Sequence, residues 1–240
     1  MSTVQALRNW VKAGERPIAA AVKAIVLSFR TVSIPVVPGV HKVLYFLHRL
    51  LSGSSSACMR VLWYTPLFQS RLTEPAERLY LYGGLPLVLG PVEITLGHSV
   101  RMSAQTTIAG RTVSKKTPVL KVGDNVDIGW QTTIAVGSRV EIGNNVRIAG
   151  RAFLAGYPGH PIDAQARAAG QPDTDEQVGD IVLEDDVWLA TNVTVSAGVR
   201  IGAGTIIAAG SVVTHDLPPG ILAAGVPARA IRSLAVDRRP

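Results

Sequence analysis

The chain has 240 residues, of which 47% are hydrophobic and only 5% are aromatic. This length allows one or two domains with a sizeable buried core, and the composition favours a core of small aliphatic side chains. The single cysteine, Cys58, excludes an internal disulfide framework and favours a reducing compartment.

Charge is distributed unevenly along the chain. Residues 1–80 contain ten Lys and Arg and three Asp and Glu, a balance of +7, whereas residues 81–240 contain fourteen of each sign and are neutral. The first third therefore has a separate role. We predict a basic, amphipathic helical segment over 1–80, a β domain over 81–234 and a tail over 235–240. No nucleic-acid recognition motif accompanies the basic charge, so no nucleic-acid partner is expected.

The stretch Ile18–Leu51 is apolar but is interrupted by charges and prolines. A spanning helix needs about 20 mostly apolar residues, and neither half of the stretch supplies them. No small-residue cleavage site follows, so we expect no signal peptide. The part Val40–Leu51 predicts an interfacial helix with two distinct faces. Its apolar face comprises Val43, Leu44, Phe46, Leu47, Leu50 and Leu51, and its polar face comprises His41, Lys42, Tyr45, His48 and Arg49.

Upstream of this helix, basic residues recur at helical spacing and would form one stripe. They are Arg8, Lys12, Arg16, Lys23 and Arg30. Gly14 and Pro17 predict a break into two helices. Basic amphipathic helices of this kind can lie on an anionic membrane surface, or they can pack on the rest of the chain or on a partner subunit. Both interpretations stay open.

A repeat of six residues defines the second part of the chain. Aliphatic residues return every six positions at Leu183, Leu189, Val195, Ile201, Ile207 and Val213, and small or β-branched residues follow at Val187, Val193, Val199, Thr205 and Ser211. The same frame occurs earlier at Leu96, Met102, Ile108, Val122, Ile128, Ile134, Ile142, Ile148 and Leu154. Six residues suit one short strand and a turn, and stacked coils bury a continuous core. We predict a mainly β fold in the form of a parallel β-helix.

The repeat is interrupted twice, and interruptions of a solenoid often carry function. The short one, Ser114–Lys121, is basic, and the long one runs from about 156 to 180. A loop of this length inside a domain is usually functional or disordered. Prolines stiffen its entry, and we expect an arm that presents His160. Asp163 either orients His160 or pairs with Arg167 one helical turn later.

Several segments together carry a resemblance to a known family. They are Gly159-His160-Pro161-Ile162-Asp163, Asp186-Val187-Trp188-Leu189, Ala209-Gly210-Ser211-Val212-Val213-Thr214 and Ala224-Gly225-Val226-Pro227-Ala228-Arg229. Over about residues 96–234 the chain resembles the hexapeptide-repeat O-acetyltransferases that act on galactosides, maltose and nodulation factors, and those of bacterial polysaccharide biosynthesis. The resemblance implies a left-handed parallel β-helix, with the loop at about 156–180 inserted into an acyltransferase domain. It also implies a homotrimer packed through flat faces, with active sites between subunits.

The resemblance further implies transfer of an acetyl group from acetyl-CoA to a saccharide hydroxyl, in surface polysaccharide or glycolipid biosynthesis. A hydroxyl is a poor nucleophile at neutral pH and needs a positioned base; by resemblance His160 is that base, with Asp163 in a supporting role. The residues implied to bind CoA are Trp188, Ala190, Thr191, Ala209, Thr214, Arg229 and Arg232. The arginines suit phosphate, and the alanines leave room for a pantetheine arm.

Two positions depart from the pattern of these relatives. His215 stands where many have lysine, which weakens one phosphate contact, and Gly129-Trp130-Gln131 stands where many have an asparagine near the acceptor. Trp130 and Gln131 are therefore candidates for contacting the acceptor.

The same coil also occurs in proteins with other functions. A metal-dependent hydratase on the same coil needs three histidine ligands, but His98, His160 and His215 are widely separated, so no metal is expected. A non-catalytic scaffold and an acyltransferase for a small non-sugar acceptor remain alternatives, although a scaffold has no need of the histidine arm. The basic segment suggests a cytoplasmic enzyme, peripheral on the inner face of the cytoplasmic membrane, with a lipid-linked saccharide as acceptor.

Overall fold

The computed structural model describes residues 2–14 and 16–234, so the predicted tail 235–240 lies outside the described residues. The chain divides into two compact units, Met1–Ser52 and Gly53–Pro240. The segment predicted over 1–80 therefore extends over the first unit and the beginning of the second. Each unit is described by itself.

The first unit consists of helices. Helix α1 (Thr3–Ala13) ends at Gly14, whose φ of 63° is the left-handed conformation that glycine adopts at no steric cost. Helix α2 (Pro17–Thr31) begins with Pro17 in its first turn, where a missing N–H is harmless. The predicted break between two helices is confirmed. In the described part of the chain, no helix is both long and apolar enough to cross a membrane.

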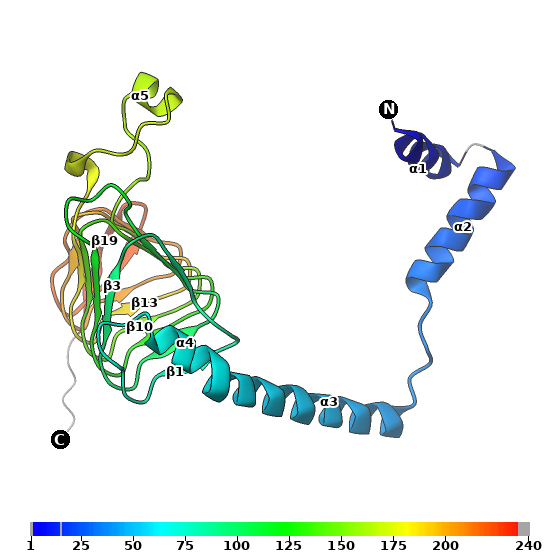
Figure 1. The fold of residues 1–240 in the computed structure, drawn as a ribbon, viewed down its shortest axis with the longest axis horizontal. Coiled ribbons are helices and arrows are strands. Elements are labelled where there is room, and N and C mark those ends of the chain that lie inside the picture. The colour runs from blue at the N-terminus through cyan, green and yellow to red at the C-terminus, as the bar shows by residue number, and fades with distance from the viewer. Residues whose placement is uncertain (1, 15, 235–240) are drawn as a thin grey trace. The chain divides into compact units, whose positions relative to one another are not determined.

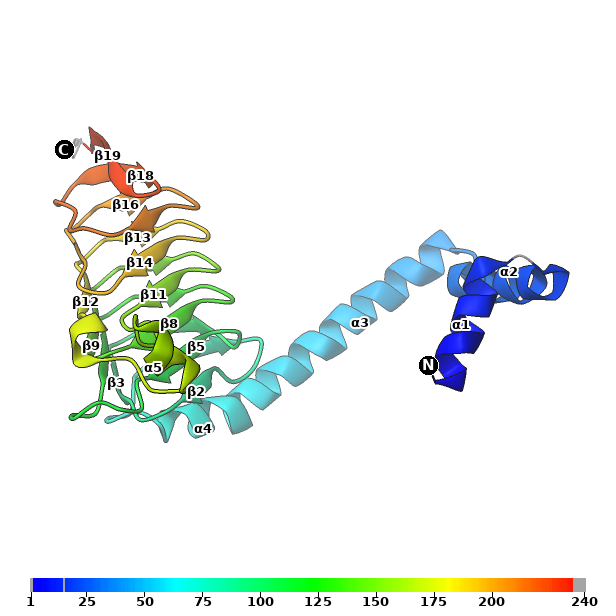
Figure 2. The ribbon, with the colours of Figure 1, turned by 90° about the horizontal axis from the view of Figure 1, so that it is seen from above.

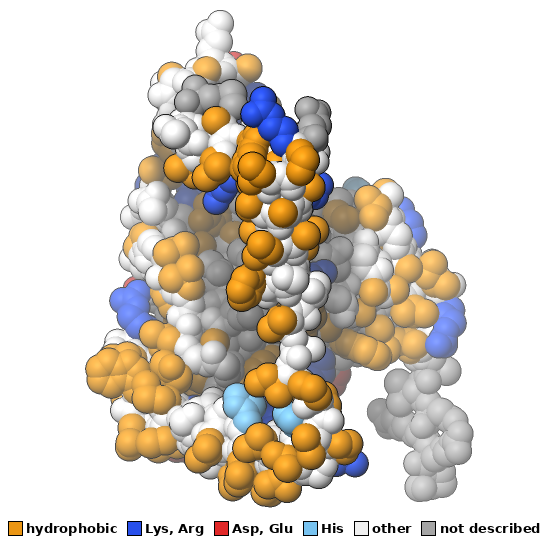
Figure 3. Space-filling model, turned by 90° about the vertical axis from the view of Figure 1, so that its right-hand side faces the viewer, with side chains coloured by type: hydrophobic (Ala, Val, Ile, Leu, Met, Phe, Trp, Pro, Cys, Tyr) orange, Lys and Arg blue, Asp and Glu red, His pale blue; other side chains and the backbone are white. Residues whose placement is uncertain are grey.

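Helix α3 (Pro38–Met59) is longer than the predicted Val40–Leu51. It passes into a π-helical turn, η1 (Arg60–Tyr64), and then into α4 (Thr65–Gln69). The serine-rich stretch after Leu51 resembles a helix end in the sequence, but Ser52 Oγ donates to the carbonyl of His48 at 2.7 Å and so is satisfied inside the helix. The apolar residues predicted for one face of this helix are all exposed. Figure 3 shows such hydrophobic side chains along the helices that face the viewer, with Lys and Arg between them.

The second unit is a stack of triangular coils whose strands form three sheets (Figures 1 and 2). Sheet A contains β3 (Glu93–Leu96), β6 (Val119–Val122), β9 (Arg139–Ile142), β12 (Ile181–Leu183) and β15 (Arg200–Ile201). Sheet B contains β1 (Tyr80–Tyr82), β4 (Arg101–Ser103), β7 (Asp127–Ile128), β10 (Arg147–Ile148), β13 (Trp188–Leu189), β16 (Ile206–Ile207), β18 (Ile221–Gly225) and β19 (Ala228–Ser233). Sheet C contains β2 (Leu87–Leu89), β5 (Thr107–Gly110), β8 (Thr133–Val136), β11 (Phe153–Ala155), β14 (Thr194–Ser196) and β17 (Val212–Val213).

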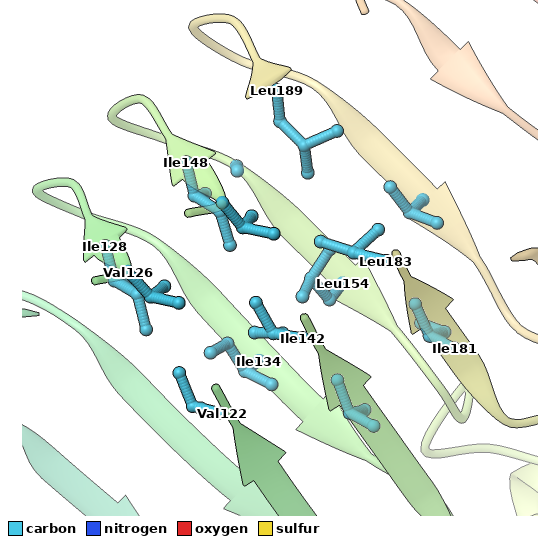
Figure 4. Close-up of a cluster of buried hydrophobic side chains, with 14 of the residues drawn as sticks. Val122, Val126, Ile128, Ile134, Ile142, Ile148, Leu154, Ile181, Leu183 and Leu189 are labelled. Carbon is cyan, nitrogen blue, oxygen red and sulfur yellow. The ribbon is translucent and has the colours of Figure 1, made fainter. Parts of the chain in front are cut away.

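Neighbouring strands within each sheet are parallel, apart from the antiparallel pair β18–β19 at the end of the stack. The chain visits sheets A, B and C in turn, so each coil has three corners. The register of the paired strands places the residues of the six-residue repeat in the core. Ile128 pairs with Ile148, and Ile148 pairs with Leu189. Figure 4 shows these three side chains one above another, with Ile134 and Leu154 forming a second such row. The predicted parallel β-helix and its inward positions are confirmed.

The N-terminal end of the stack is covered by residues that precede the first coil. Phe68, Ala76 and Leu79 are buried in the same core as the coil, and Leu72 forms a parallel bridge with Ile94 of sheet A. The coil core therefore begins about twelve residues before β1, within the segment predicted as helical.

Candidate active site

The long interruption of the repeat, residues 156–180, leaves the coil where sheet C passes to sheet A, between β11 and β12. It contains a short helix, α5 (Ala164–Ala168), and a 3-10 turn, η2 (Asp175–Gln177), and it extends from the body of the coil in Figure 1. We call this segment the arm. His160 lies in its first part with an exposed side chain. Within the described residues the imidazole forms no hydrogen bond, so it is free to meet a substrate.

The contacts of Asp163 differ from both alternatives predicted for it. Its Oδ1 accepts the N–H of Ala166 at 2.7 Å, which caps the N-terminus of α5. Arg167 donates instead to the carbonyls of Pro161 and Ile162, at 2.9 and 2.8 Å. Asp163 therefore neither pairs with Arg167 nor contacts His160 in this chain. The carboxylate of Asp163 is held at the start of α5 because it accepts a helix N–H that has no partner within the helix.

The base of the arm is held by a buried ion pair that the sequence did not reveal. Arg111 Nε lies 2.6 Å from Asp173 Oδ1, and the two side chains are only 6% and 3% exposed. A second nitrogen of Arg111 lies 2.7 Å from Asp175, and a third donates to the backbone carbonyl of Asp173 at 2.9 Å. The other carboxylate oxygen of Asp173 accepts the N–H of Gly159 at 3.0 Å. The pair thus fixes the residue immediately before His160.

Further groups join this anchor. Burial lowers the pKa of the Arg111 guanidinium, but hydrogen bonds to Asp175 and Asp173 outweigh that effect and raise it. Burial and the nearby charge of Asp173 raise the pKa of the Tyr157 hydroxyl. Gln177 Nε2 donates to the backbone carbonyl of His160 at 3.1 Å. The only signal in the sequence was that Arg111 stands shortly before the short basic interruption, Ser114–Lys121.

Trp130 and Gln131 lie at a different corner, where sheet B passes to sheet C. The Arg151 guanidinium lies over the Trp130 ring, 5.1 Å from its centroid, and its Nε lies 3.2 Å from Gln131 Oε1. The ring covers Gly150, where an added Cβ would approach the indole to 2.5 Å. Gln131 and Arg151 adopt φ values of 56° and 64°, a left-handed turn conformation that recurs in other coils, for example at Asn145 and Asn192. Arg151, which contacts both predicted acceptor candidates, was not identified from the sequence.

Several predicted CoA-binding residues lie along this same corner in the next coils. The carbonyl of Thr191 accepts the N–H of Gly210 at 3.0 Å, which stacks Thr191 and Ala209 on successive turns. Trp188 lies on the outer face of sheet B, 48% exposed, with Arg147 and Ile206 as its neighbours in register. The small side chain of Ala190 is half-buried and that of Ala209 is exposed.

The remaining predicted residues lie elsewhere. Thr214 follows β17 at the corner from sheet C to sheet A, with its hydroxyl 2.8 Å from His215 Nδ1. Arg229 and Arg232 are exposed on β19 beyond the last complete coil. Sheet C thus separates the corner that carries Trp130, Thr191 and Ala209 from the corner that carries the arm. One chain alone does not bring the predicted site residues together.

Among the described residues, no group of three or more His, Cys, Asp and Glu side chains is arranged to hold a metal ion.

The coil and its repeat define a class of protein. Residues 180–215 match the family described as bacterial transferase hexapeptide (six repeats). Together with the three parallel sheets, this match confirms the predicted left-handed parallel β-helix of the hexapeptide-repeat type. The arm lies just before the matched residues.

The particular relatives can be named. The chain is 36% identical over 115 residues to the galactoside O-acetyltransferase of Escherichia coli (strain K12), an alignment that covers 48% of this chain and 54% of that protein. The aligned part thus spans about half the length of that relative. Among solved structures, AntD, an N-acyltransferase from Bacillus cereus in complex with dTDP and 3-hydroxybutyryl-CoA, superimposes with a TM-score of 0.55 at 15% identity, over 70% of this chain and 86% of that one. The predicted resemblance to hexapeptide-repeat acetyltransferases is confirmed.

Proposed function

We propose that the protein is a CoA-dependent O-acetyltransferase that moves an acetyl group from acetyl-CoA to a hydroxyl of a saccharide. The observation that carries this proposal is the arm: a buried ion pair holds its base, and an exposed imidazole stands beside that anchor on a hexapeptide coil. The similarity to a galactoside O-acetyltransferase supports the reaction type and the class of acceptor. A scaffold would have no use for a buried charge pair that fixes a single exposed loop.

In the proposed reaction, His160 takes the proton of the acceptor hydroxyl as its oxygen attacks the thioester carbonyl. A C–O bond forms, the C–S bond breaks, and the proton passes to the departing CoA thiolate. A positioned base contributes about 10²–10⁴-fold in rate. Holding donor and acceptor in reacting geometry contributes more.

We propose that the site is completed by a second copy of the chain in a homotrimer. The outward residues of sheets A and B include charged side chains, whereas no strand of sheet C contains a charged residue. An uncharged face is the one that loses least on being buried. Sheet C also lies between the arm at one edge and the corner of Thr191 and Ala209 at the other. Packing through this face would bring His160 of one copy toward that corner of its neighbour.

The side chains predicted to bind CoA suit that substrate. Ala190 and Ala209 leave space for a pantetheine chain, and Trp188 offers an exposed aromatic face. Arg229 and Arg232 are exposed cations on β19 that suit phosphate groups. Thr214 and His215 lie at the opposite edge of sheet C, at the end of β17.

We further propose that the protein works in the cytoplasm, peripherally on the inner face of the membrane, on a lipid-linked saccharide of surface polysaccharide or glycolipid biosynthesis. Support comes from the exposed apolar side chains of α1 to α3 and from the net charge of +7 carried by the first 80 residues. A groove between α1 and α2 is lined by apolar residues that include Val11 and Val26 and by basic residues that include Lys12 and Lys23. Such a surface suits anionic lipid.

The reaction is tested by following free thiol release from acetyl-CoA with the full-length protein, with and without saccharide and small non-sugar acceptors. Saccharide-dependent release supports the proposal. Release that depends only on a small non-sugar acceptor would support the alternative acyltransferase, and no release with any acceptor would favour a scaffold.

The membrane proposal is tested by co-sedimentation with vesicles of phosphatidylglycerol and phosphatidylcholine. The test variant replaces Arg8, Lys12 and Lys23 with glutamine, and the control replaces Lys121 of sheet A. Each basic residue contributes about 1 kcal/mol near an anionic surface, so the triple variant should bind about 100-fold more weakly. Equal pelleting of all three proteins would contradict the membrane part and leave the transferase untouched.

A further inference from the structure

A pocket lies where the π-helical turn η1 packs on the first coil, away from the arm and from the predicted CoA residues. Its walls include Arg60, Tyr64, Tyr80, Tyr82 and the backbone at Gly83 and Gly84. All of these belong to the second compact unit. The two glycines have φ values of 82° and 130°, which leave that side of the pocket as bare backbone.

Two arginines and two tyrosines are stacked at this pocket. The Arg60 guanidinium lies 4.6 Å from the centroid of the Tyr80 ring, and that of Arg101 lies 4.9 Å from the centroid of Tyr82. The two rings are stacked on each other, with centroids 6.4 Å apart. Stacking on an aromatic face holds a guanidinium in place and leaves its N–H groups available at the edge.

The two arginines differ in their partners. Arg101 is paired with Asp127 at 3.3 Å. The guanidinium of Arg60 forms no hydrogen bond or ion pair with any described residue, and the walls of the pocket contain no acidic side chain. A guanidinium can bind a carboxylate or a phosphate through two N–H groups. A half-buried, oriented arginine with no anionic partner therefore suits an anion from outside the chain.

The backbone at Arg60 is unusual in the same place. The five residues Arg60–Tyr64 form a π-helical turn between α3 and α4, and the N–H of Thr65 bonds to the carbonyl of Arg60. Single π-helical turns inside α-helices are rare and are frequently found at functional sites. Here the turn begins at the residue that carries the unpaired guanidinium.

We propose that this pocket binds an anionic group, a phosphate or carboxylate, of the saccharide acceptor; the assignment to the acceptor rests on the proposed function. The pocket includes residues of β1, and Trp188 of the predicted CoA site lies on β13. Four strand steps separate these two strands in sheet B, which is about 19 Å at the usual strand spacing. The pocket therefore holds a part of the acceptor remote from the reacting hydroxyl. Binding energy gained there positions the rest of the molecule for reaction.

The anionic group can belong to a lipid-linked saccharide diphosphate, to a nucleoside diphosphate sugar or to an acidic saccharide. All three present the same chemistry to Arg60. They differ in what surrounds the anion, so the experiment includes one probe for each source.

The first measurement is the binding of pyrophosphate to the full-length protein without CoA, by isothermal titration calorimetry at low salt. We expect binding to the wild type and at least about tenfold weaker binding to Arg60→Gln, because hydrogen bonds to a charged group are lost. Arg60→Lys keeps the charge but not the two-pronged geometry, and should fall between them. Arg71→Gln, at an exposed arginine next to the Leu72–Ile94 bridge, is the matched control and should bind like the wild type.

No binding to the wild type, or equal binding to the wild type and Arg60→Gln, would overturn the proposal. If Arg60→Gln does not fold, the comparison of Arg60→Lys with the wild type decides in the same way. Since no CoA is present, failure here leaves the thiol-release assay unaffected. Conversely, anion binding without any acetyl transfer would keep the site and remove its assignment to an acceptor.

The second measurement identifies the source. Polyisoprenyl diphosphate in phosphatidylcholine vesicles, a soluble nucleoside diphosphate and a carboxylated oligosaccharide are each used to compete with pyrophosphate. The proposal expects at least one of them to compete in the wild type and to lose about tenfold in Arg60→Gln. Failure of all three to compete would overturn the assignment to an acceptor.

Discussion

The guanidinium of Arg111 and the carboxylate of Asp173 form a buried ion pair, with Nε and Oδ1 2.6 Å apart, and Asp173 in turn accepts the N–H of Gly159, the neighbour of His160. Two distant segments are joined here: the corner after β5 and the end of the arm. The position of His160 is therefore set by a residue of the coil and not by the arm alone.

Replacing Arg111 with methionine tests this positioning role. Removing one partner of a buried pair leaves an unpaired charge, at a cost of about 3–5 kcal/mol. The arm can relieve that cost by detaching, so we expect the coil to stay folded by circular dichroism while kcat for acetyl transfer falls and KM for acetyl-CoA changes little. Arg139→Gln, which breaks exposed ion pairs, should have almost no effect. Equal losses in the two variants, or a change confined to KM, would contradict the role.

The rate at which the arm is cleaved by a protease should depend on pH, because Asp175 is part of the contacts that hold the arm to the coil. Hydrogen bonds from Arg111, then from Lys115, hold the pKa of Asp175 below its ordinary value of 3.8. A carboxyl with a depressed pKa stabilises the folded state above its unfolded pKa, and that contribution is lost as the pH falls through the folded value. Limited proteolysis of the arm should therefore stay slow at neutral pH and accelerate only below about pH 3.8. In Asp175→Asn this acid step should shrink, and an unchanged step would show that another group controls it.

The rows of the coil core predict a stability difference between inward and outward positions. Leu154 is fully buried between Ile134 and Val195 in register, so Leu154→Ala should lower the free energy of unfolding by about 2–5 kcal/mol. Lys121→Ala, at an exposed position of sheet A, should change it by less than about 0.5 kcal/mol. Denaturant unfolding of both variants measures the difference. Similar values for the two would contradict the register of the repeat.

Sheet C should control the assembly of the chain. Phe153 lies on its outer face and is 40% exposed in the single chain, so Phe153→Asp places a charge in the proposed trimer interface. We expect light scattering to show trimers for the wild type and smaller species for Phe153→Asp. Thr95→Asp, on the outer face of sheet A, should remain trimeric. Dissociation by Thr95→Asp alone would move the interface to another face.

The coil could be predicted from the sequence because its information is local. Leu183, Leu189 and Val195 recur at a fixed period, and that period alone determines which side chains point inward. The arm could be located for the complementary reason, since it is where the period fails. The break at Gly14 and Pro17 was equally local, because each residue fixes its own backbone.

What could not be predicted depends on contacts between distant segments or on competition for one group. Arg111 lies just before the short interruption and Asp173 lies within the long one, and nothing in the period brings them together. The spacing in the sequence allows the carboxylate of Asp163 to contact His160, Arg167 or a backbone N–H of the following helix. Only the structure shows that it accepts the N–H of Ala166. The continuation of α3 past Leu51 is accompanied by a hydrogen bond from the Ser52 hydroxyl back to the helix. The stacking of Arg60 on Tyr80 depends on how η1 packs on the first coil.

The most direct test of the central claim is the rate of acetyl transfer by His160→Ala, compared with the wild type and with His98→Ala as a control. His98 is exposed and lies 3.0 Å from Glu77 at another corner, so its loss should leave the rate unchanged. We expect His160→Ala to remain folded and to lose about 10²–10⁴-fold in kcat. A His160→Ala protein that transfers acetyl groups to a saccharide at the wild-type rate would contradict the assignment of His160 as the base.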